Sequence, residues 1–291
     1  MTQTVEVVIP VYNERNEALR ATLAACLQQT HPIARIYVVD DGSRRPVALP
    51  EVPQPAPEIS LLRLEQNQGI SAARNAAIAR STAPFLVCIN AEVLPDPDWL
   101  ATCVDYMSSR PQLGACYTRL VSATPDRLLT RWRMRFFELK FGPLSGPTPF
   151  AVGHAVLFRR EAVDSVRGYN PLLRLHHEDS DICFRMRAAG WDTHYVAQSK
   201  CVSIQGDSLP ELTRKILRDA GWYSPSESSL VHLYFAHTKM TLIRAGRNVV
   251  KGRFSFLPID AAIWVYGLWM ATSRTLRFRV TKRKAVQPIT N

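Results

Sequence analysis

The sequence contains few cysteines and lacks the patterns in which cysteines usually act. Six cysteines are spread through 291 residues without a CxxC pair. This spacing excludes a disulfide-rich secreted scaffold and predicts free thiols in a reducing compartment. No charged leader or cleavage site precedes the first apolar run, which begins at Val5. We therefore expect no secretory signal and a cytoplasmic location.

Two phosphate-binding motifs are also missing. Neither GxGxxG nor GxxxxGK[ST] occurs, which excludes the dinucleotide fingerprint and the P-loop. A cationic side chain would then have to contact any phosphate. Long apolar runs are missing too: the stretch 256–271 is interrupted by Pro258 and Asp260. It is shorter than the roughly 20 residues that span a bilayer.

The composition is that of an ordinary globular protein, with 46% hydrophobic and 21% charged residues. The net charge of +11 is concentrated near one end. Residues 239–291 hold eleven Lys and Arg against one acid, Asp260. Basic charge confined to one segment favours an anionic membrane surface over nucleic acid. A helix packed on the rest of the protein, with a solvated basic end, is the alternative.

Short β-branched runs alternate with helical spacing through the first two thirds of the chain. Strands are expected at 6–11, 36–39, 59–64, 85–89, 114–121, 151–158 and 193–196, and helices at 16–29, 71–80, 98–108, 161–167 and 178–189. Arg and aromatic residues interleave in 124–148, which could form an amphipathic helix. The alternation predicts an α/β fold with a wound, mostly parallel sheet over residues 1–205. A helical, basic extension is expected over 206–291.

Four of the expected strands end in polar clusters. These are Tyr12-Asn13-Glu14, Asp40-Asp41-Gly42-Ser43, Asn67-Gln68-Gly69 and Asn90-Ala91-Glu92. In a wound sheet such ends lie side by side and form one cleft. Each cluster alone could consist of ordinary turn residues, but four such clusters at successive strand ends favour a binding site. The cluster Asn67-Gln68-Gly69 forms a glycine loop. Arg74 follows this loop in the first turns of a helix, where it could contact phosphate.

These segments, with His177-Glu178-Asp179 running into Arg185 and Ala189-Gly190-Trp191, resemble the family 2 inverting glycosyltransferases of GT-A fold. The resemblance covers roughly residues 5–205. It implies that three residues of the first strand and its loop border the nucleotide base: Pro10, Tyr12 and Glu14. It implies further that Asp41 accepts a hydrogen bond from uracil and that Arg74 contacts the diphosphate.

The resemblance also places the catalytic base at Asp179, with Glu178 beside it. Inverting transfer needs a base near the acceptor hydroxyl, on the face opposite the leaving nucleotide. The structural alternative for Asp179 is an acid favoured at a helix N-terminus by the helix dipole. Trp191 is either a core residue or a ring that stacks on the acceptor sugar.

The sequence departs from the family where a metal is usually bound. Asn90-Ala91-Glu92 stands in place of the usual Asp-x-Asp. Glu92 could still hold Mg²⁺ or Mn²⁺, and Asn90 could bind a ribose, so a divalent metal is expected to bind, but more weakly than in relatives with Asp-x-Asp. The His found near a Gly-Ser pair in many relatives is also missing. His154, His176 and His177 are expected close to the cleft, with His154 and His177 near the donor or acceptor sugar, although an isolated His is more often structural.

The sequence therefore predicts an inverting transfer from a nucleotide sugar, with UDP-sugar as the expected donor, to an acceptor hydroxyl. The expected acceptor is a saccharide or lipid-linked precursor of a polysaccharide or glycolipid, at the inner face of the cell membrane. Nucleic acid is not an expected partner. One alternative is a catalytically silent binding protein of the same fold. The other is a transferase that acts on a soluble peptide or small molecule.

Overall fold

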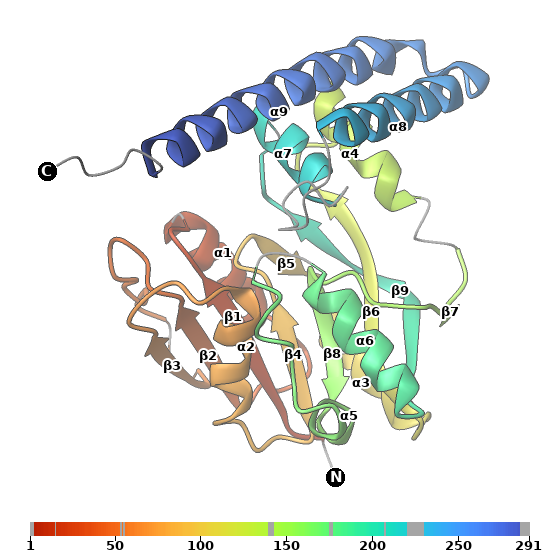
Figure 1. The fold of residues 1–291 in the computed structure, drawn as a ribbon. Coiled ribbons are helices and arrows are strands. Elements are labelled where there is room, and N and C mark those ends of the chain that lie inside the picture. The colour runs from red at the N-terminus through yellow and green to blue at the C-terminus, as the bar shows by residue number, and fades with distance from the viewer. Residues whose placement is uncertain are drawn as a thin grey trace, which may run out of the picture. The chain divides into compact units, whose positions relative to one another are not determined.

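The computed structural model describes residues 3–14, 16–52, 54, 56–138, 143–174, 177–206, 208–219 and 230–285 (Figure 1). The chain forms two compact units. The first comprises Met1–Thr124 and Phe136–Gln205, and the second comprises Pro125–Arg135 and Gly206–Asn291. The segment before α4 and most of that helix thus belong with the C-terminal helices.

A mixed β-sheet forms the centre of the first unit. Its strands are β1 (Val5–Val11), β2 (Arg35–Asp40), β3 (Glu58–Arg63), β4 (Phe85–Ile89), β5 (Val93–Pro95), β6 (Leu113–Ser122), β7 (Gly146–Pro147), β8 (Ala155–Arg159) and β9 (Asp192–Ser203). Their order is β3-β2-β1-β4-β8-β6-β9-β5, and β7 pairs with β9. The first four are mutually parallel, whereas β8 runs antiparallel between β4 and β6. The start of β8 therefore lies beside the carboxyl end of β4.

Helices cover both faces of this sheet (Figure 1). The first core contains residues of α1 (Asn16–Leu27) and α3 (Trp99–Ser108). The second contains residues of α2 (Ile70–Ile78), α5 (Arg160–Ser165) and α6 (Glu178–Ala188). Strand β1 is apolar almost throughout because its alternate side chains enter the two cores.

The fold class predicted from the sequence is confirmed, and most of the expected strands and helices form within a few residues of their predicted bounds. Two short strands, β5 and β7, were not predicted. Strand β9 extends to Ser203, well beyond the expected 193–196. Its later residues alternate between buried and partly exposed positions. Polar residues such as Lys200 therefore interrupt the apolar run by which a strand is recognised in a sequence. All six cysteines are buried free thiols.

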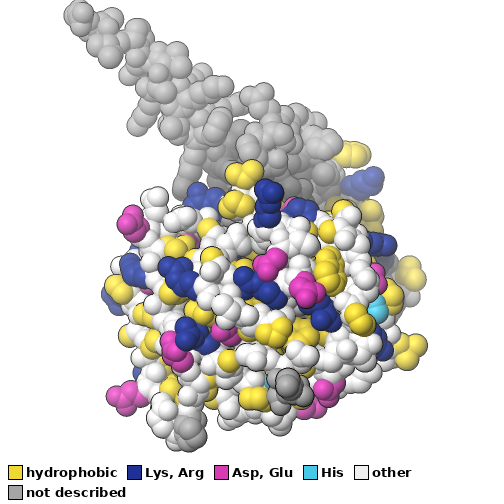
Figure 2. Space-filling model, turned by 90° about the horizontal axis from the view of Figure 1, so that it is seen from below, with side chains coloured by type: hydrophobic (Ala, Val, Ile, Leu, Met, Phe, Trp, Pro, Cys, Tyr) yellow, Lys and Arg dark blue, Asp and Glu magenta, His cyan; other side chains and the backbone are white. Residues whose placement is uncertain are grey.

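Charges of both signs lie close together on the first unit. Figure 2 views the molecule from below and shows Lys, Arg, Asp and Glu side chains among apolar ones. The described residues on this face form no large patch of one sign. This mixture agrees with the nearly balanced charge of residues 1–238 in the sequence.

The second unit is helical. It contains most of α4 (Leu128–Glu138), with α7 (Leu209–Asp219), α8 (Leu230–Val250), the 3₁₀-helix η1 (Phe254–Phe256) and α9 (Leu257–Ala285). Buried hydrogen bonds join α4 to the others: the Trp132 indole donates to Asp260 over 3.0 Å, and Arg135 donates to Asn248. Within the described residues, no helix combines the length and apolar character needed to cross a membrane.

Candidate active site

The loops after β1 and β2 are bonded to each other at the carboxyl edge of the sheet. Asn13 adopts a left-handed conformation, with φ of 52°, and its backbone N–H donates to the Ser43 hydroxyl over 2.9 Å. Tyr12, beside this turn, is 48% exposed. Pro10 and Glu14 flank it and are partly buried. The structure thus brings these three predicted base-binding residues to one place, although their contact with a base stays a prediction.

Asp40 fixes the conformation of the loop that follows β2. One oxygen of its buried carboxylate accepts the Ser43 N–H over 2.9 Å, and the other accepts the Val47 N–H over 3.2 Å and the Arg63 guanidinium. Burial by itself would raise the pKa of Asp40. The hydrogen bonds and the charge of Arg63 outweigh burial and hold that pKa below its usual value. Asp40 is thus an ionised structural anchor.

Asp41 holds the glycine loop that precedes α2. Its buried carboxylate accepts hydrogen bonds from the Gln68 N–H at 2.7 Å, the Gly69 N–H at 2.8 Å and the Asn67 amide at 2.9 Å. A carboxylate offers about four lone-pair positions, so little capacity remains for another donor. Gly69 has a φ of 97°, and a Cβ there would lie 2.5 Å from the Arg174 carbonyl oxygen. The predicted uracil contact of Asp41 stays a prediction.

Arg74 lies inside the protein, one turn into α2. Its side chain is only 1% exposed, and Nη1 donates to Glu178 Oε1 over 2.9 Å. Nη2 donates to Asn90 Oδ1 and to the Gly153 carbonyl, each over 3.2 Å. The guanidinium lies 5.0 Å from the centre of the Tyr169 ring. Burial would lower the pKa of Arg74, but Tyr169 and Glu178 outweigh it and raise the pKa above its usual value.

Arg74 therefore connects three segments that lie far apart in the sequence: the end of β4, the approach to β8 and the start of α6. Both Nη atoms of its guanidinium donate to protein acceptors. Its predicted contact with the diphosphate stays a prediction, because in this conformation the guanidinium is buried and bonded to the protein.

Asp179 is oriented by hydrogen bonds at the start of α6. Oδ2 accepts the Gly153 N–H over 2.9 Å, and Oδ1 accepts the Ser180 N–H over 2.8 Å. A Cβ on Gly153 would come within 2.9 Å of the Asp179 Cβ, so only glycine admits the carboxylate this closely. Asp179 is partly exposed, whereas Glu178 is buried. The two adjacent acids therefore face different surroundings.

Sequence reasoning missed Gly153 and the role of Tyr169. Gly153 could have been suspected, because a glycine at the entry of a strand often marks a close approach of another group. Tyr169 gave no such signal. Its position depends on a reciprocal pair of hydrogen bonds between its backbone and the Asn75 amide, at 2.8 and 2.9 Å.

The residues around Asn90 and Glu92 do not by themselves fit a resident divalent cation. Asn90 Oδ1 already accepts a hydrogen bond from cationic Arg74, so it is a poor metal ligand. Glu92 follows it and is partly buried. Across the described parts of the chain, no group of three or more His, Cys, Asp and Glu side chains is placed to hold a metal.

The two predicted sugar-binding histidines lie in different environments. His154 is buried, and desolvation lowers its pKa to about 3, against an opposing hydrogen bond to the Thr118 backbone. Its imidazole is thus neutral and lies edge-on to the Tyr117 ring at 6.5 Å. His177 is exposed and adopts a left-handed φ of 66° directly before α6. It adjoins the acidic pair, whereas His176 lies outside the described residues.

Trp191 is not brought to the acidic pair. It follows the C-terminal end of α6, and a helix of 11 residues is about 16 Å long. Its indole N–H donates to the Ser165 hydroxyl over 3.2 Å, and its ring packs against the second core. These contacts favour the core alternative that the sequence left open.

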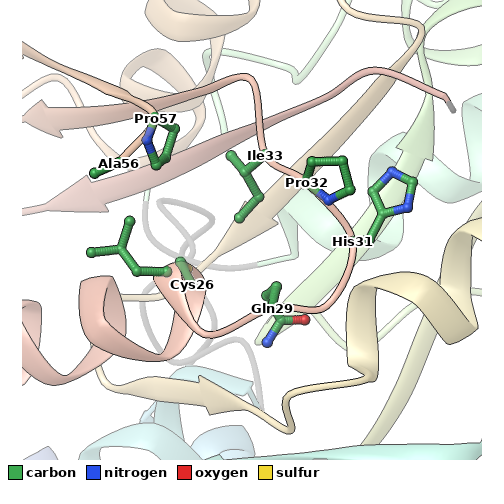
Figure 3. A pocket seen from close by; sticks show the side chains of 8 residues that line it. Cys26, Gln29, His31, Pro32, Ile33, Ala56 and Pro57 are labelled. Carbon is green, nitrogen blue, oxygen red and sulfur yellow. The ribbon is translucent and has the colours of Figure 1, made fainter. Parts of the chain in front are cut away.

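A separate cavity of about 250 Å³ lies away from these residues. Figure 3 shows that its lining side chains come from the end of α1, the loop before β2 and the segment before β3. It therefore lies near the amino ends of the parallel strands. Ligands of wound sheets bind at the opposite edge, so this cavity is not the candidate site.

Comparison with known proteins agrees with this geometry. The sequence model of glycosyl transferase family 2 matches residues 6–167 of this chain. The chain belongs to this family. The matched region contains the loops after β1 and β2, the glycine loop, Arg74 and Asn90, whereas the acidic pair lies beyond its end.

Individual relatives of this family 2 chain are distant. A putative cellulose synthase 2 of Komagataeibacter xylinus is 24% identical over 218 residues, covering 71% of this chain and 14% of that protein. A pre-mycofactocin glycosyltransferase of Mycobacterium tuberculosis is 27% identical, covering 66% and 40%. An N-acetylglucosaminyltransferase of Mesorhizobium japonicum is 25% identical, covering 98% and 73%. The chain thus spans less than half the length of the first two.

Two solved structures support the GT-A fold. The mannosyltransferase PcManGT from Pyrobaculum calidifontis, in complex with GDP-Man and Mn²⁺, aligns with a TM-score of 0.58 and 18% identity over 91% of this chain and 87% of that one. GalNAc-T7 with UDP, GalNAc and Mn²⁺ aligns with a TM-score of 0.55 and 18% identity over 75% and 48%. At these identities the likeness concerns the fold alone.

Proposed function

We propose that this family 2 chain transfers a sugar from a nucleotide sugar to an acceptor hydroxyl, with inversion at the anomeric carbon. The observation that carries the proposal is the arrangement of the acidic pair. Asp179 is partly exposed and fixed by the Gly153 N–H, while its neighbour Glu178 is paired with buried Arg74. The Asp179 carboxylate is thereby held in a defined direction. Glu178 instead pairs with Arg74, which also donates to the carbonyl of Gly153, the residue whose N–H holds Asp179.

Asp179 is proposed as the general base. Its carboxylate takes the proton of the acceptor hydroxyl as the oxygen electron pair attacks the anomeric carbon. The bond between that carbon and the diphosphate oxygen breaks, and its electron pair leaves with the nucleoside diphosphate. The reaction therefore needs one base and forms no covalent intermediate with the protein. The hydrogen bonds to Asp179 restrict the rotation of its carboxylate, so less entropy is lost when the base is aligned with the acceptor hydroxyl.

The donor site is proposed at the carboxyl ends of β1, β2 and β4. Tyr12, Pro10 and Glu14 would border the base, and the loop held by Asp41 would contact the nucleotide, with UDP-sugar as the expected donor. The buried charge of Arg74 would stabilise the diphosphate as negative charge develops on it, because such charges act strongly where water is excluded. Two solved GT-A neighbours hold UDP or GDP-Man, which supports a nucleotide donor.

A divalent cation is proposed to bind only together with the donor. Both of these neighbours also contain Mn²⁺, but Glu92 is the single carboxylate at the corresponding strand end here. Mg²⁺ commonly combines few carboxylates with substrate phosphates. The oxygens of the donor diphosphate would therefore supply most of the ligands of the cation.

The acceptor is proposed to be a saccharide or lipid-linked precursor at the inner face of the cell membrane. Residues 1–205 would form the catalytic domain and 206–291 an extension, with which the segment 125–135 forms one compact unit. The net charge of +10 over 239–291 supports a membrane location. A soluble acceptor is the main rival, and a catalytically silent binding protein is the other.

A donor screen followed by a transfer assay tests the proposal. Thermal unfolding is measured with UDP-, GDP- and dTDP-sugars, because a ligand present at about 100 times its dissociation constant stabilises the folded state by about 2.7 kcal/mol. A stabilising donor is then incubated with candidate acceptors, and nucleotide release is measured. Stabilisation by UDP-sugars with acceptor-dependent release of UDP is expected. Stabilisation without release under any condition would favour the silent binding protein.

A further inference from the structure

Helix α8 is packed with its polar side inward. Its buried described positions recur every three or four residues and are polar: His237, Thr241, Arg244 and Asn248. In a water-soluble protein the buried stripe of a surface helix is normally apolar. The buried stripe of α8 is therefore the reverse of that pattern.

The partners of this polar stripe lie mainly on α9. The Asn248 amide donates to the buried carboxylate of Asp260. His237 lies 3.3 Å from the Trp264 carbonyl oxygen, and a Cβ on Gly267 would come within 2.3 Å of the His237 ring. Arg244 donates to the Thr241 hydroxyl over 2.9 Å. Asn248 and His237 thus join the two helices, whereas the bond between Arg244 and Thr241 lies within α8.

The opposite side of α8 exposes apolar side chains. On α8 and at the start of η1 these are Phe235, Met240, Leu242, Ile243, Val249, Val250 and Phe254. Leu242 is 66% exposed and Val250 is 87% exposed. They lie about two turns apart, and α9 adds Trp264, Val265 and Trp269 to the exposed apolar residues. Such a concentration of apolar surface normally marks an interaction site.

The charges among these residues are all positive. Lys239, Arg247 and Lys251 are exposed on α8 and just after it. The only acid between residues 230 and 291 is Asp260, which is 1% exposed and bonded inside the unit. A second copy of this surface would bring like charges together, which opposes self-association. Anionic lipid head groups complement the bases, and acyl chains complement the apolar side chains.

We propose that the exposed apolar side of α8 and η1, with its flanking bases, lies in the head-group region of an anionic membrane. The inference deepens the proposed membrane location and rests on it. The helices would lie along the interface, with Leu242, Val250 and Phe254 inserted and Arg247 and Lys251 at head-group level. The inward polar stripe keeps its hydrogen bonds in this arrangement, so no buried polar group has to enter the lipid.

Vesicle sedimentation of the full chain tests this assignment. The triple variant Leu242→Ser, Val250→Ser, Phe254→Ser removes apolar side chains that are already exposed, so its melting temperature should match the parent. Leu144→Ser is the control, because Leu144 is exposed on the first unit. Binding to phosphatidylcholine vesicles that contain phosphatidylglycerol should fall by on the order of 1,000-fold in the triple variant, since each of the three inserted side chains contributes roughly tenfold.

The parent and the control should bind these vesicles equally, and high salt should weaken both. Equal binding by the triple variant and the parent would overturn the assignment. Failure of the parent to bind anionic vesicles would also overturn it. So would a dimer of the parent in sedimentation velocity that is lost in the triple variant, because the surface would then be a protein interface. Donor binding is measured on the same samples by calorimetry. Failure of vesicle binding with donor binding retained therefore refutes the membrane surface without refuting the transferase.

Discussion

Replacing Arg74 by methionine should destabilise the first unit strongly, because Glu178 would lose its buried partner. Both side chains are nearly inaccessible, at 1% and 9% exposure. Removing one member of a buried ion pair typically costs about 3–5 kcal/mol. The contact with the Tyr169 ring and the hydrogen bond to the Gly153 carbonyl would also be lost.

The assay is thermal unfolding followed by circular dichroism. For a domain of roughly 150–250 residues, 1 kcal/mol corresponds to about 2–4 °C in melting temperature. The loss should therefore be about 6–20 °C. Arg80→Met is the matched control, since Arg80 is exposed just beyond α2, and it should change the stability by about 0.5 kcal/mol or less.

A double-mutant cycle separates the ion pair from general damage to packing. Glu178→Gln in the Arg74→Met background removes the uncompensated carboxylate, so it should restore much of the lost stability. The reasoning is refuted if Arg74→Met melts together with the Arg80→Met control. It is also refuted if the double variant loses the full sum of the two single losses.

Three further predictions concern the strand ends. In Asp41→Asn, UDP should bind more weakly by about 1–3 kcal/mol, and the amides of Gln68 and Gly69 should exchange faster with solvent; unchanged calorimetric affinity would contradict the placement. The lowered pKa of Asp40 means that its interactions stabilise the fold above the unfolded carboxyl pKa of about 3.9 and are lost as pH falls through the folded value. The stability gap between the parent and Asp40→Asn should therefore narrow in acid, and a gap that stays constant down to about pH 3 would refute this. Nucleotide-free protein should bind Mn²⁺ weakly, whereas tight binding that Glu92→Gln abolishes would show a resident metal site.

Local patterns in the sequence predicted the parts of the site that depend on local structure. The apolar runs of β1, β2 and β4 and the polar residues that end them are contiguous in the chain. Parallel pairing then brings those ends to one edge of the sheet, as expected. The acidic pair at the start of α6 is likewise a local signal.

Contacts between distant segments could not be predicted in this way. Arg74 and Glu178 are 104 positions apart, and their pairing depends on the antiparallel insertion of β8, which the alternating pattern did not reveal. That insertion also brings Gly153 to Asp179. Burial of His154 depends on its place between neighbouring strands. A single histidine in the sequence looks the same whether it becomes a sugar ligand or a neutral core residue.

Turnover of the Asp179→Asn variant tests the central claim most directly. Asparagine keeps the size of the side chain but cannot accept the proton of the acceptor hydroxyl. Asp181→Asn is the control, because Asp181 lies on the same helix and pairs with Arg185 instead. With a donor and acceptor that the parent uses, Asp179→Asn should lower kcat by about 100-fold or more with donor affinity retained. Asp181→Asn should leave kcat close to that of the parent. Parental turnover in Asp179→Asn would contradict the assignment of the base.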